Sequence, residues 1–384
     1  MKKKCGVRNA ECGSLLFAAL LITVISFFSS SASAQSGRKT PTTKNPSEKT
    51  DLSIDTTEVR VPIRAYNNIG KPLTDLTTKD FVVIENGAGR QVTNLKFEPA
   101  NILLVLDLSN EIGTFKNGES DRINIYSDHR DYEKIEDKDM IRQKPRPLIE
   151  DPAPREFAYN FVDNLSATDR VAIIQYSDKT QLIQDWTLDH KAAREALSSK
   201  FRVGIKSTFH DALALSAKKL EECKTGRRVI VLLSDGFDSA SKISRTKAMD
   251  ALMKTEASIF VVSWTELLRS EVIKAAQWNN TNEAAGSRKF KRQDELNTFL
   301  RKLDGKETEL KALAELTGGE FYLPMRFKFF VRQSPEILKD IGAQYTLSYL
   351  TEKDFVEASF RSIQVLGARS GLTVKSRQRR YSGD

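Results

Sequence analysis

The sequence predicts a doubly wound α/β domain with a mostly parallel sheet, together with a small β-sandwich. Two observations predict the α/β domain: continuous apolar runs recur along the middle of the chain, and amphipathic helical patterns separate them. A third observation predicts the sandwich, because segments with strand-like alternation lie at both ends of the chain. With 384 residues, the chain is long enough to bury a sizeable core in two domains.

The first 34 residues have the pattern of an export signal. Residues 1–8 are rich in Lys and Arg, residues 15–28 form a compact apolar run, and small residues follow up to Ala34. We therefore expect a signal peptide over 1–34, cleaved near Ala34, and a periplasmic or extracellular mature protein. The alternative is an uncleaved anchor, but this run is shorter than the roughly 20 residues that span a bilayer. No later stretch is apolar enough to form a transmembrane segment.

Cleavage at this point would change the meaning of the chain's charge. The whole sequence carries a formal charge of +9, but residues 1–34 hold four basic residues and one acidic residue, so the remaining 350 carry +6. Residues 1–34 also hold two of the three cysteines, so the remaining chain has only Cys223 and no possible internal disulfide. Basic residues do not alternate with aromatic ones as a stacking platform requires, so we expect no nucleic-acid partner.

Strand patterns at the two ends predict the sandwich. Residues 35–56 are polar and read as a flexible linker, residues 57–98 predict three short strands, and residues 344–381 predict three more. Three short strands cannot form a stable domain alone, so we expect the two sets to pair, with the α/β domain inserted between them. The alternative is two independent β appendages.

Residues 100–330 carry the alternation expected of the α/β domain. Buried strands are predicted at 102–106, 171–174, 229–233 and 259–262, an antiparallel edge strand at 180–186 and a last short strand at 320–323. Helices are predicted at 155–165, 190–199, 209–223, 246–254 and 310–316, and another at 335–341. Two polar insertions, 112–154 and 265–309, interrupt the pattern.

Oxygen-bearing side chains stand where the predicted strands and helices end. Asp107 and Ser109 follow the first buried strand, Thr208 precedes a helix, and Asp235 follows another buried strand. Because ligands of such sheets bind at the carboxyl ends of the strands, we expect these side chains to lie together. Carboxylate and hydroxyl oxygens suit Mg²⁺, Mn²⁺ or Ca²⁺. The alternative is that the two aspartates only cap helices or brace loops.

These residues resemble the metal-ion-dependent adhesion site of von Willebrand factor type A domains, which reads D-x-S-x-S, then T, then D in separate loops. Asp107, Ser109, Thr208 and Asp235 match that pattern in kind and order. The resemblance implies a non-enzymatic adhesion or protein-interaction module. It also implies a divalent cation, Mg²⁺ or else Mn²⁺ or Ca²⁺, that engages an acidic group on a protein partner. By the same resemblance, the Ser and Thr hydroxyls ligate the ion directly and the two aspartates act largely through water.

Over residues 57–381 the chain also resembles a narrower family, the exported bacterial "VWFA-related acidobacterial" proteins, which implies a place in the bacterial envelope. The segments that carry this resemblance include Gly70-Lys71-Pro72-Leu73, Glu85-Asn86-Gly87 and Phe360-Arg361-Ser362-Ile363.

Two features depart from the family pattern. Glu111 stands where the family has Ser; its carboxylate either completes the metal coordination from within or turns away and leaves a poorer site. The insertion over 112–154 replaces a short turn, and residues 111–151 hold eleven acidic and eight basic residues. Such a run is either a solvated loop or, because of its position beside the site, a lid or partner contact.

Two other functions stay open. The chain has no G-x-G-x-x-G, Walker or G-x-S-x-G motif, and its histidines, His129, His190 and His210, lack ligand spacing. His210 is close enough to Thr208 in sequence to be the general base of a metal-assisted hydrolase. The other alternative is a metal-free structural module of the envelope. The sequence leaves the partner's identity and the oligomeric state open.

Overall fold

The computed structural model describes residues 56–109, 113–116, 119–122, 153–270, 272–273, 288–352 and 359–382, which all belong to one compact unit, Ser53–Asp384. The predicted signal peptide (1–34), nearly all of the linker, Glu111 and most of the 112–154 insertion lie outside the described residues.

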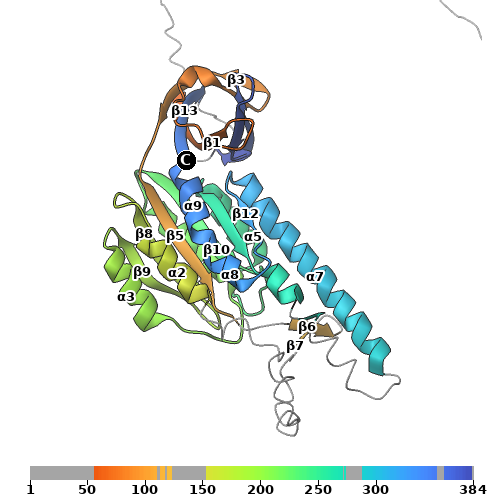
Figure 1. Ribbon diagram of the computed structural model, residues 1–384. Helices are drawn as coiled ribbons and strands as arrows, with labels where there is room; N and C mark the ends of the chain where they lie inside the picture. Colours follow the sequence, from red (N-terminus) through yellow and green to blue (C-terminus); the bar gives the residue numbers. More distant parts are fainter. Residues whose placement is uncertain are drawn as a thin grey trace, which may run out of the picture. The chain divides into compact units, whose positions relative to one another are not determined.

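A six-stranded sheet forms the centre of the α/β part (Figure 1). In spatial order its strands are β12 (Phe321–Tyr322), β11 (Ser258–Ser263), β10 (Arg227–Ser234), β5 (Ala100–Asp107), β8 (Arg170–Tyr176) and β9 (Thr180–Thr187). The first five are parallel, and β9 runs antiparallel to β8 at the edge, as the alternating pattern predicts. Every residue of β5 and β11 is buried, as expected for strands covered on both faces.

Helices cover both faces of this sheet. One face carries α2 (Ala153–Asp163), α3 (His190–Lys200), α8 (Phe327–Val331) and α9 (Gln333–Gly342), and the other carries α4 (Phe209–Glu221) and α5 (Arg245–Lys254). Successive residues of β5 alternate between the two resulting cores: Leu104 belongs to the first and Leu103 to the second. The predicted doubly wound fold is therefore confirmed.

One helix is much longer than the sequence predicts. We expect a helix only at 310–316, but α7 spans Arg288–Leu316 and so takes up part of the polar 265–309 insertion. The sequence of α7 is highly charged, and its few apolar residues do not form the periodic pattern that predicts a helix. Phe299 and Leu303, one turn apart, are nevertheless buried in the first core, and Leu313 is buried in the second. The single helix thus contributes to both cores.

Strands from the two ends of the chain form the sandwich. One sheet has the order β15 (Thr373–Ser376), β1 (Thr56–Tyr66), β13 (Gln344–Glu352) and β4 (Val92–Lys96); the other has β16 (Arg379–Tyr381), β14 (Phe360–Gly367), β2 (Phe81–Glu85) and β3 (Ala88–Arg90). The N-terminal β1 pairs with the C-terminal β13 and β15, and β2 pairs with β14. Val61 and Val365 share one core, so the strands do not form two independent appendages.

The described chain also contains a helical stretch at 265–270 and three further short elements. The three short elements are the 3₁₀ helix η1 (Thr78–Asp80) and a separate two-stranded sheet of β6 (Gly113–Lys116) and β7 (Glu119–Arg122).

Buried arginines tie the sandwich strands to the α/β part. The Arg64 guanidinium, on β1, donates to the Gly319 carbonyl oxygen at 2.6 Å and lies 3.2 Å from the Asp340 carboxylate. Arg227, at the start of β10, donates to the side-chain oxygen of Gln344, on β13, at 3.0 Å. The chain itself thus supplies hydrogen-bond partners for both guanidinium groups, although Arg64 Nε has none among the described residues.

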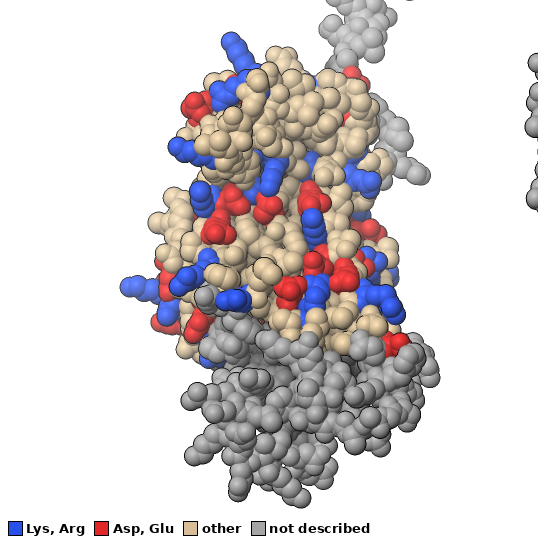
Figure 2. Space-filling model, turned by 45° about the vertical axis from the view of Figure 1, so that its right-hand side comes forward, with Lys and Arg blue, Asp and Glu red and all other residues tan. Residues whose placement is uncertain are grey.

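The charged surface is mixed. Figure 2 shows Lys and Arg side chains interspersed with Asp and Glu over the described part of the face in view. This face lacks the single-sign basic stripe that is typical of nucleic-acid binding. Among the described residues, no helix combines the length and the apolar character needed to cross a membrane.

Candidate functional site

The predicted site residues gather at the carboxyl edge of the central sheet. Asp107 is the last residue of β5, and Asp235 directly follows β10, its parallel neighbour, in which Leu233 lies opposite Leu106. Ser109 lies two residues beyond β5, and Thr208 is the N-cap residue of α4. All four side chains are buried. Glu111, the fifth predicted residue, lies outside the described residues.

The first motif, Asp107 to Ser109, is closed by hydrogen bonds between its own residues. The Oδ1 atom of Asp107 accepts hydrogen bonds from the Ser109 backbone N–H at 3.0 Å and from its hydroxyl at 2.6 Å. Among the described residues, the other carboxylate oxygen, Asp107 Oδ2, has no hydrogen-bond partner although it is buried. A buried acceptor without a partner is costly, so this oxygen is a place where a ligand would be stabilised.

The loops that carry Thr208 and Asp235 are bonded to each other. The Ser207 carbonyl oxygen accepts from the backbone N–H groups of Ser239 and Ala240, at 3.0 and 2.9 Å, and the Ser207 hydroxyl donates to the Phe237 carbonyl oxygen at 2.8 Å. These bonds fix the two loops relative to each other. Thr208 and Asp235 are therefore carried by loops that the chain itself holds together.

The Thr208 hydroxyl faces other oxygens. It donates to the Ser177 carbonyl oxygen at 3.0 Å and lies 2.9 Å from the Thr180 hydroxyl. The Thr208 hydroxyl therefore lies in a polar environment at the carboxyl edge of the sheet.

Both aspartates of the site have raised pKa values. Burial raises the pKa of Asp107 well above its usual range, and the negative charge of Asp235 raises this pKa further. Burial also raises the pKa of Asp235 to about 6, although its carboxylate accepts the Phe237 backbone N–H at 2.9 Å. Within the described parts of the chain, neither aspartate forms an ion pair. Two buried carboxylates without a paired cation are unfavourable, and a cation would relieve them.

A tyrosine that the sequence analysis missed lies at the same edge. Tyr176 ends β8, on the other side of β5, and its hydroxyl donates to the Ser234 hydroxyl at 2.7 Å. Burial, together with the charges of Asp107 and Asp235, raises the pKa of this tyrosine well above its usual range. Its position was available from the sequence, because Tyr176 ends an apolar run just as Asp107 does.

His210 is held by a carboxylate. Its Nδ1 lies 3.3 Å from Asp238 Oδ2, and its backbone N–H donates to the other oxygen of Asp238 at 3.2 Å. Burial would raise the pKa of Asp238, but hydrogen bonds from His210 and Ser241 outweigh burial and lower it. The imidazole is thus oriented by Asp238, which the sequence analysis did not single out.

The oxygen atoms of the site suit a hard cation. Within the described residues, no group of three or more His, Cys, Asp or Glu side chains is arranged to hold a metal ion. The candidate site instead combines two carboxylates with the hydroxyls of Ser109 and Thr208. Together with the unpartnered Asp107 Oδ2, this donor set fits Mg²⁺, Mn²⁺ or Ca²⁺ and does not resemble the nitrogen and sulfur sites of zinc.

Comparison with solved structures finds similar folds at low identity. A von Willebrand factor type A protein from Catenulispora acidiphila is 11% identical, with 80% of this chain and 75% of that chain covered and a TM-score of 0.40. An aerotolerance-related membrane protein from Bacteroides fragilis is 14% identical, with 63% and 98% covered and a TM-score of 0.35. The manganese-loaded TRAP protein of Plasmodium vivax is 10% identical, with 84% and 98% covered and a TM-score of 0.34. These similarities are too low to say what this chain binds.

Sequence comparisons give one match. No curated protein sequence matches the chain. The family model of the von Willebrand factor type A domain matches residues 153–306, a range that includes Thr208 and Asp235 and begins after Asp107 and Ser109. The first motif is thus outside the matched range but lies at the carboxyl end of β5, a strand of the same sheet. The match and the doubly wound sheet together show that the chain contains a von Willebrand factor type A domain.

Proposed function

We propose that this chain is an exported, non-enzymatic interaction module that binds a divalent cation at Asp107, Ser109, Thr208 and Asp235. Through that ion it engages an acidic group on a protein partner. The observation that carries the proposal is the buried Asp107 Oδ2, which has no hydrogen-bond partner among the described residues, beside a second buried carboxylate at the same sheet edge. A bound Mg²⁺, Mn²⁺ or Ca²⁺ supplies positive charge and an open coordination position for the partner's carboxylate.

The residues of the chain have distinct parts in this proposal. The hydroxyls of Ser109 and Thr208 are direct ligands, and the two aspartates hold the ion largely through water. The bonds between the Ser207 and Ser239 loops keep these groups in place before the ion binds. Glu111 either completes the coordination or turns away and leaves a poorer site, and a Glu111→Ser variant distinguishes the two. Weaker cation binding by the variant would indicate that Glu111 is a ligand. Stronger binding would indicate that Glu111 weakens the site.

Calorimetric titration with Mn²⁺ and Mg²⁺ tests the site. We expect measurable binding heat for the wild type and none for Asp235→Ala. The matched control is Asp163→Asn, which changes an exposed aspartate on α2 and should bind the ion like the wild type. Equal heats for wild type and Asp235→Ala would rule out the site and favour the metal-free envelope module.

Export is proposed from the N-terminal pattern alone. The mature protein recovered from an envelope or culture fraction should begin at Gln35. A protein that keeps residues 1–34 would be an anchored form instead.

The Asp238–His210 pair favours one second candidate, a metal-assisted hydrolase, since a carboxylate that orients an imidazole is typical of a general base. A panel of phosphatase and esterase substrates with Mn²⁺ separates the two functions. Turnover that His210→Ala abolishes would favour the hydrolase; no turnover together with cation binding would favour the interaction module.

A further inference from the structure

Exposed aliphatic side chains lie beside the candidate metal site. Val203 and Ile205 are 49% and 51% exposed, and Ile243 is 37% exposed. We call the two segments that carry them, residues 202–206 and 242–245, the rim. Exposed aliphatic residues scattered singly on a surface need no explanation, but Val203 and Ile205 lie in a segment bonded to the first motif, and Ile243 lies in a second segment bonded to the start of α4.

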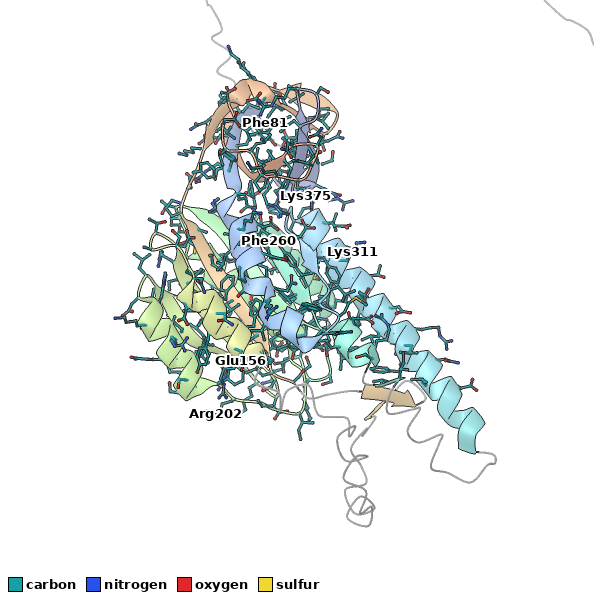
Figure 3. The ribbon with its side chains drawn as sticks, in the orientation of Figure 1. Phe81, Glu156, Arg202, Phe260, Lys311 and Lys375 are labelled. Atoms are coloured by element: carbon teal, nitrogen blue, oxygen red, sulfur yellow. The ribbon has the colours of Figure 1, made fainter. Side chains whose placement is uncertain are left out.

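Backbone contacts place the rim on two sides of the site. The Gly204 N–H donates to the Leu108 carbonyl oxygen at 3.0 Å, and Gly204 forms a parallel bridge with Ser109. On the other side, the Ile243 N–H donates at 2.9 Å to the carboxylate of Asp211, in the first turn of the helix that Thr208 caps. Figure 3 shows Arg202 at the lower edge of the α/β part, where β5 ends.

The first rim segment is held firmly. Asp178 Oδ1 accepts the backbone N–H groups of Ile205 and Lys206, at 3.1 and 2.7 Å. A Cβ atom on Gly204 would lie only 2.7 Å from the Ser177 hydroxyl, so the backbone here is in close contact with its neighbours. The aliphatic side chains are therefore presented to solvent by an ordered backbone, which lowers the entropy cost of binding a partner.

The rim is also basic. Its two segments read Arg-Val-Gly-Ile-Lys and Lys-Ile-Ser-Arg, with four basic residues and no acidic one. Arg202, Lys206 and Lys242 are exposed. Arg245 is paired with Glu309 at 3.4 Å, and the carboxylates of Asp178 and Asp211 against the rim backbone offset part of the charge, which leaves Arg202, Lys206 and Lys242 as its exposed basic side chains. Such a rim complements a partner that is acidic as well as apolar.

We infer that the partner presents a short segment in which the metal-binding carboxylate is flanked by aliphatic or aromatic side chains and by at least one further acidic residue. This inference rests on the proposed function and specifies the class of partner. The apolar neighbours pack on Val203, Ile205 and Ile243, and the additional acid faces Lys206 or Lys242.

Selection from a library of random short peptides tests the inference. The purified protein is immobilised in Mn²⁺, and bound peptides are eluted with EDTA. We expect the eluted peptides to share an Asp or Glu next to apolar residues, with an excess of acids. Eluted peptides that share only the carboxylate would overturn the inference and leave the proposed function standing. The absence of any peptide released by EDTA would contradict both.

Paired variants then test the rim directly with the best selected peptide, by fluorescence anisotropy. Val203→Ser combined with Ile205→Ser, and Lys206→Glu combined with Lys242→Glu, should each weaken peptide binding about tenfold or more. Leu188→Ser, which changes an aliphatic side chain that is 57% exposed outside the rim, should leave it unchanged. Calorimetric Mn²⁺ binding should persist in every variant, which shows that the site is folded. Unchanged peptide affinity in both rim variants would overturn the inference.

Discussion

Buried carboxylates at two places in this molecule have opposite electrostatic surroundings. In the sandwich, Glu85 is surrounded by partners: Arg380 and Arg361 pair with it, and the hydroxyls of Tyr349 and Thr351 donate to it at 3.1 and 2.6 Å. Burial alone would raise the pKa of Glu85, but the hydrogen bonds from Thr351 and Arg380 and the arginine charges outweigh burial and lower it.

At the edge of the central sheet the balance is reversed. Asp107 and Asp235 are buried near each other, and burial raises the pKa of both. The comparison separates two uses of a buried acid. Glu85 receives its positive charge from the chain and holds the sandwich together, whereas the proposed function assigns the aspartate pair a cation from outside.

The largest expected effect is at Glu85. Glu85→Gln keeps the size of the side chain but leaves Arg361 and Arg380 buried without their counter-charge, which should lower the free energy of unfolding by about 3–5 kcal/mol. Chemical denaturation followed by intrinsic fluorescence measures this loss. Asp163→Asn removes one partner of the exposed pair with Arg194 and should cost less than about 1 kcal/mol. Equal losses in the two variants would show that Glu85 is not a structural ion pair.

A smaller effect is expected from a methyl group at the rim of the site. In Gly204→Ala the added Cβ would lie 2.7 Å from the Ser177 hydroxyl and 2.8 Å from Asp178 Oδ2, so the loop must shift, at a cost of about 1–3 kcal/mol. The matched control is Gly305→Ala in α7, where nothing lies within 4 Å of the new atom. This control should gain about 0.5–1 kcal/mol, because alanine favours the helix. A neutral Gly204→Ala would mean that the loop is not held as tightly as the contacts indicate.

The smallest expected effect is a dependence on pH. Because the pKa of Glu85 is lower in the folded protein than its ordinary value of 4.5, the unfolded chain binds more protons in this range. The stability that Glu85 contributes is therefore complete above about pH 4.5 and is lost as the pH falls through the folded-state pKa. Denaturation of wild type and Glu85→Gln over falling pH should show the wild type losing more stability. Parallel losses would assign the acid sensitivity to other groups.

Much of the fold follows from local patterns. The continuous apolar runs predict the buried parallel strands correctly, and alternation predicts sandwich strands such as β14, which has one buried face. Helix α7 could not be predicted over its full length. Its buried residues, such as Phe299 and Leu303, are separated by charged residues, so only tertiary packing reveals which side is buried.

The candidate site divides in the same way. Asp107, Ser109, Thr208 and Asp235 could be selected because each lies at or just beyond the end of a strand or caps a helix. The pairing of His210 with Asp238 could not, since it depends on how the start of α4 and the loop after β10 approach each other. The sequence also does not show that Glu85 is surrounded by positive charge and Asp107 is not, because this depends on which arginines the fold brings near each acid.

The most direct test of the contrast is the stability of Asp107→Asn, measured by chemical denaturation in EDTA and in saturating Mn²⁺. In EDTA we expect the variant to be at least as stable as the wild type, because it removes a buried, unpaired charge. In Mn²⁺ at about 100 times the dissociation constant, the wild type should gain about 2.7 kcal/mol and the variant should gain little. A wild type that gains nothing from Mn²⁺, with a variant that is equally destabilised in both buffers, would contradict the account and make Asp107 a structural residue like Glu85.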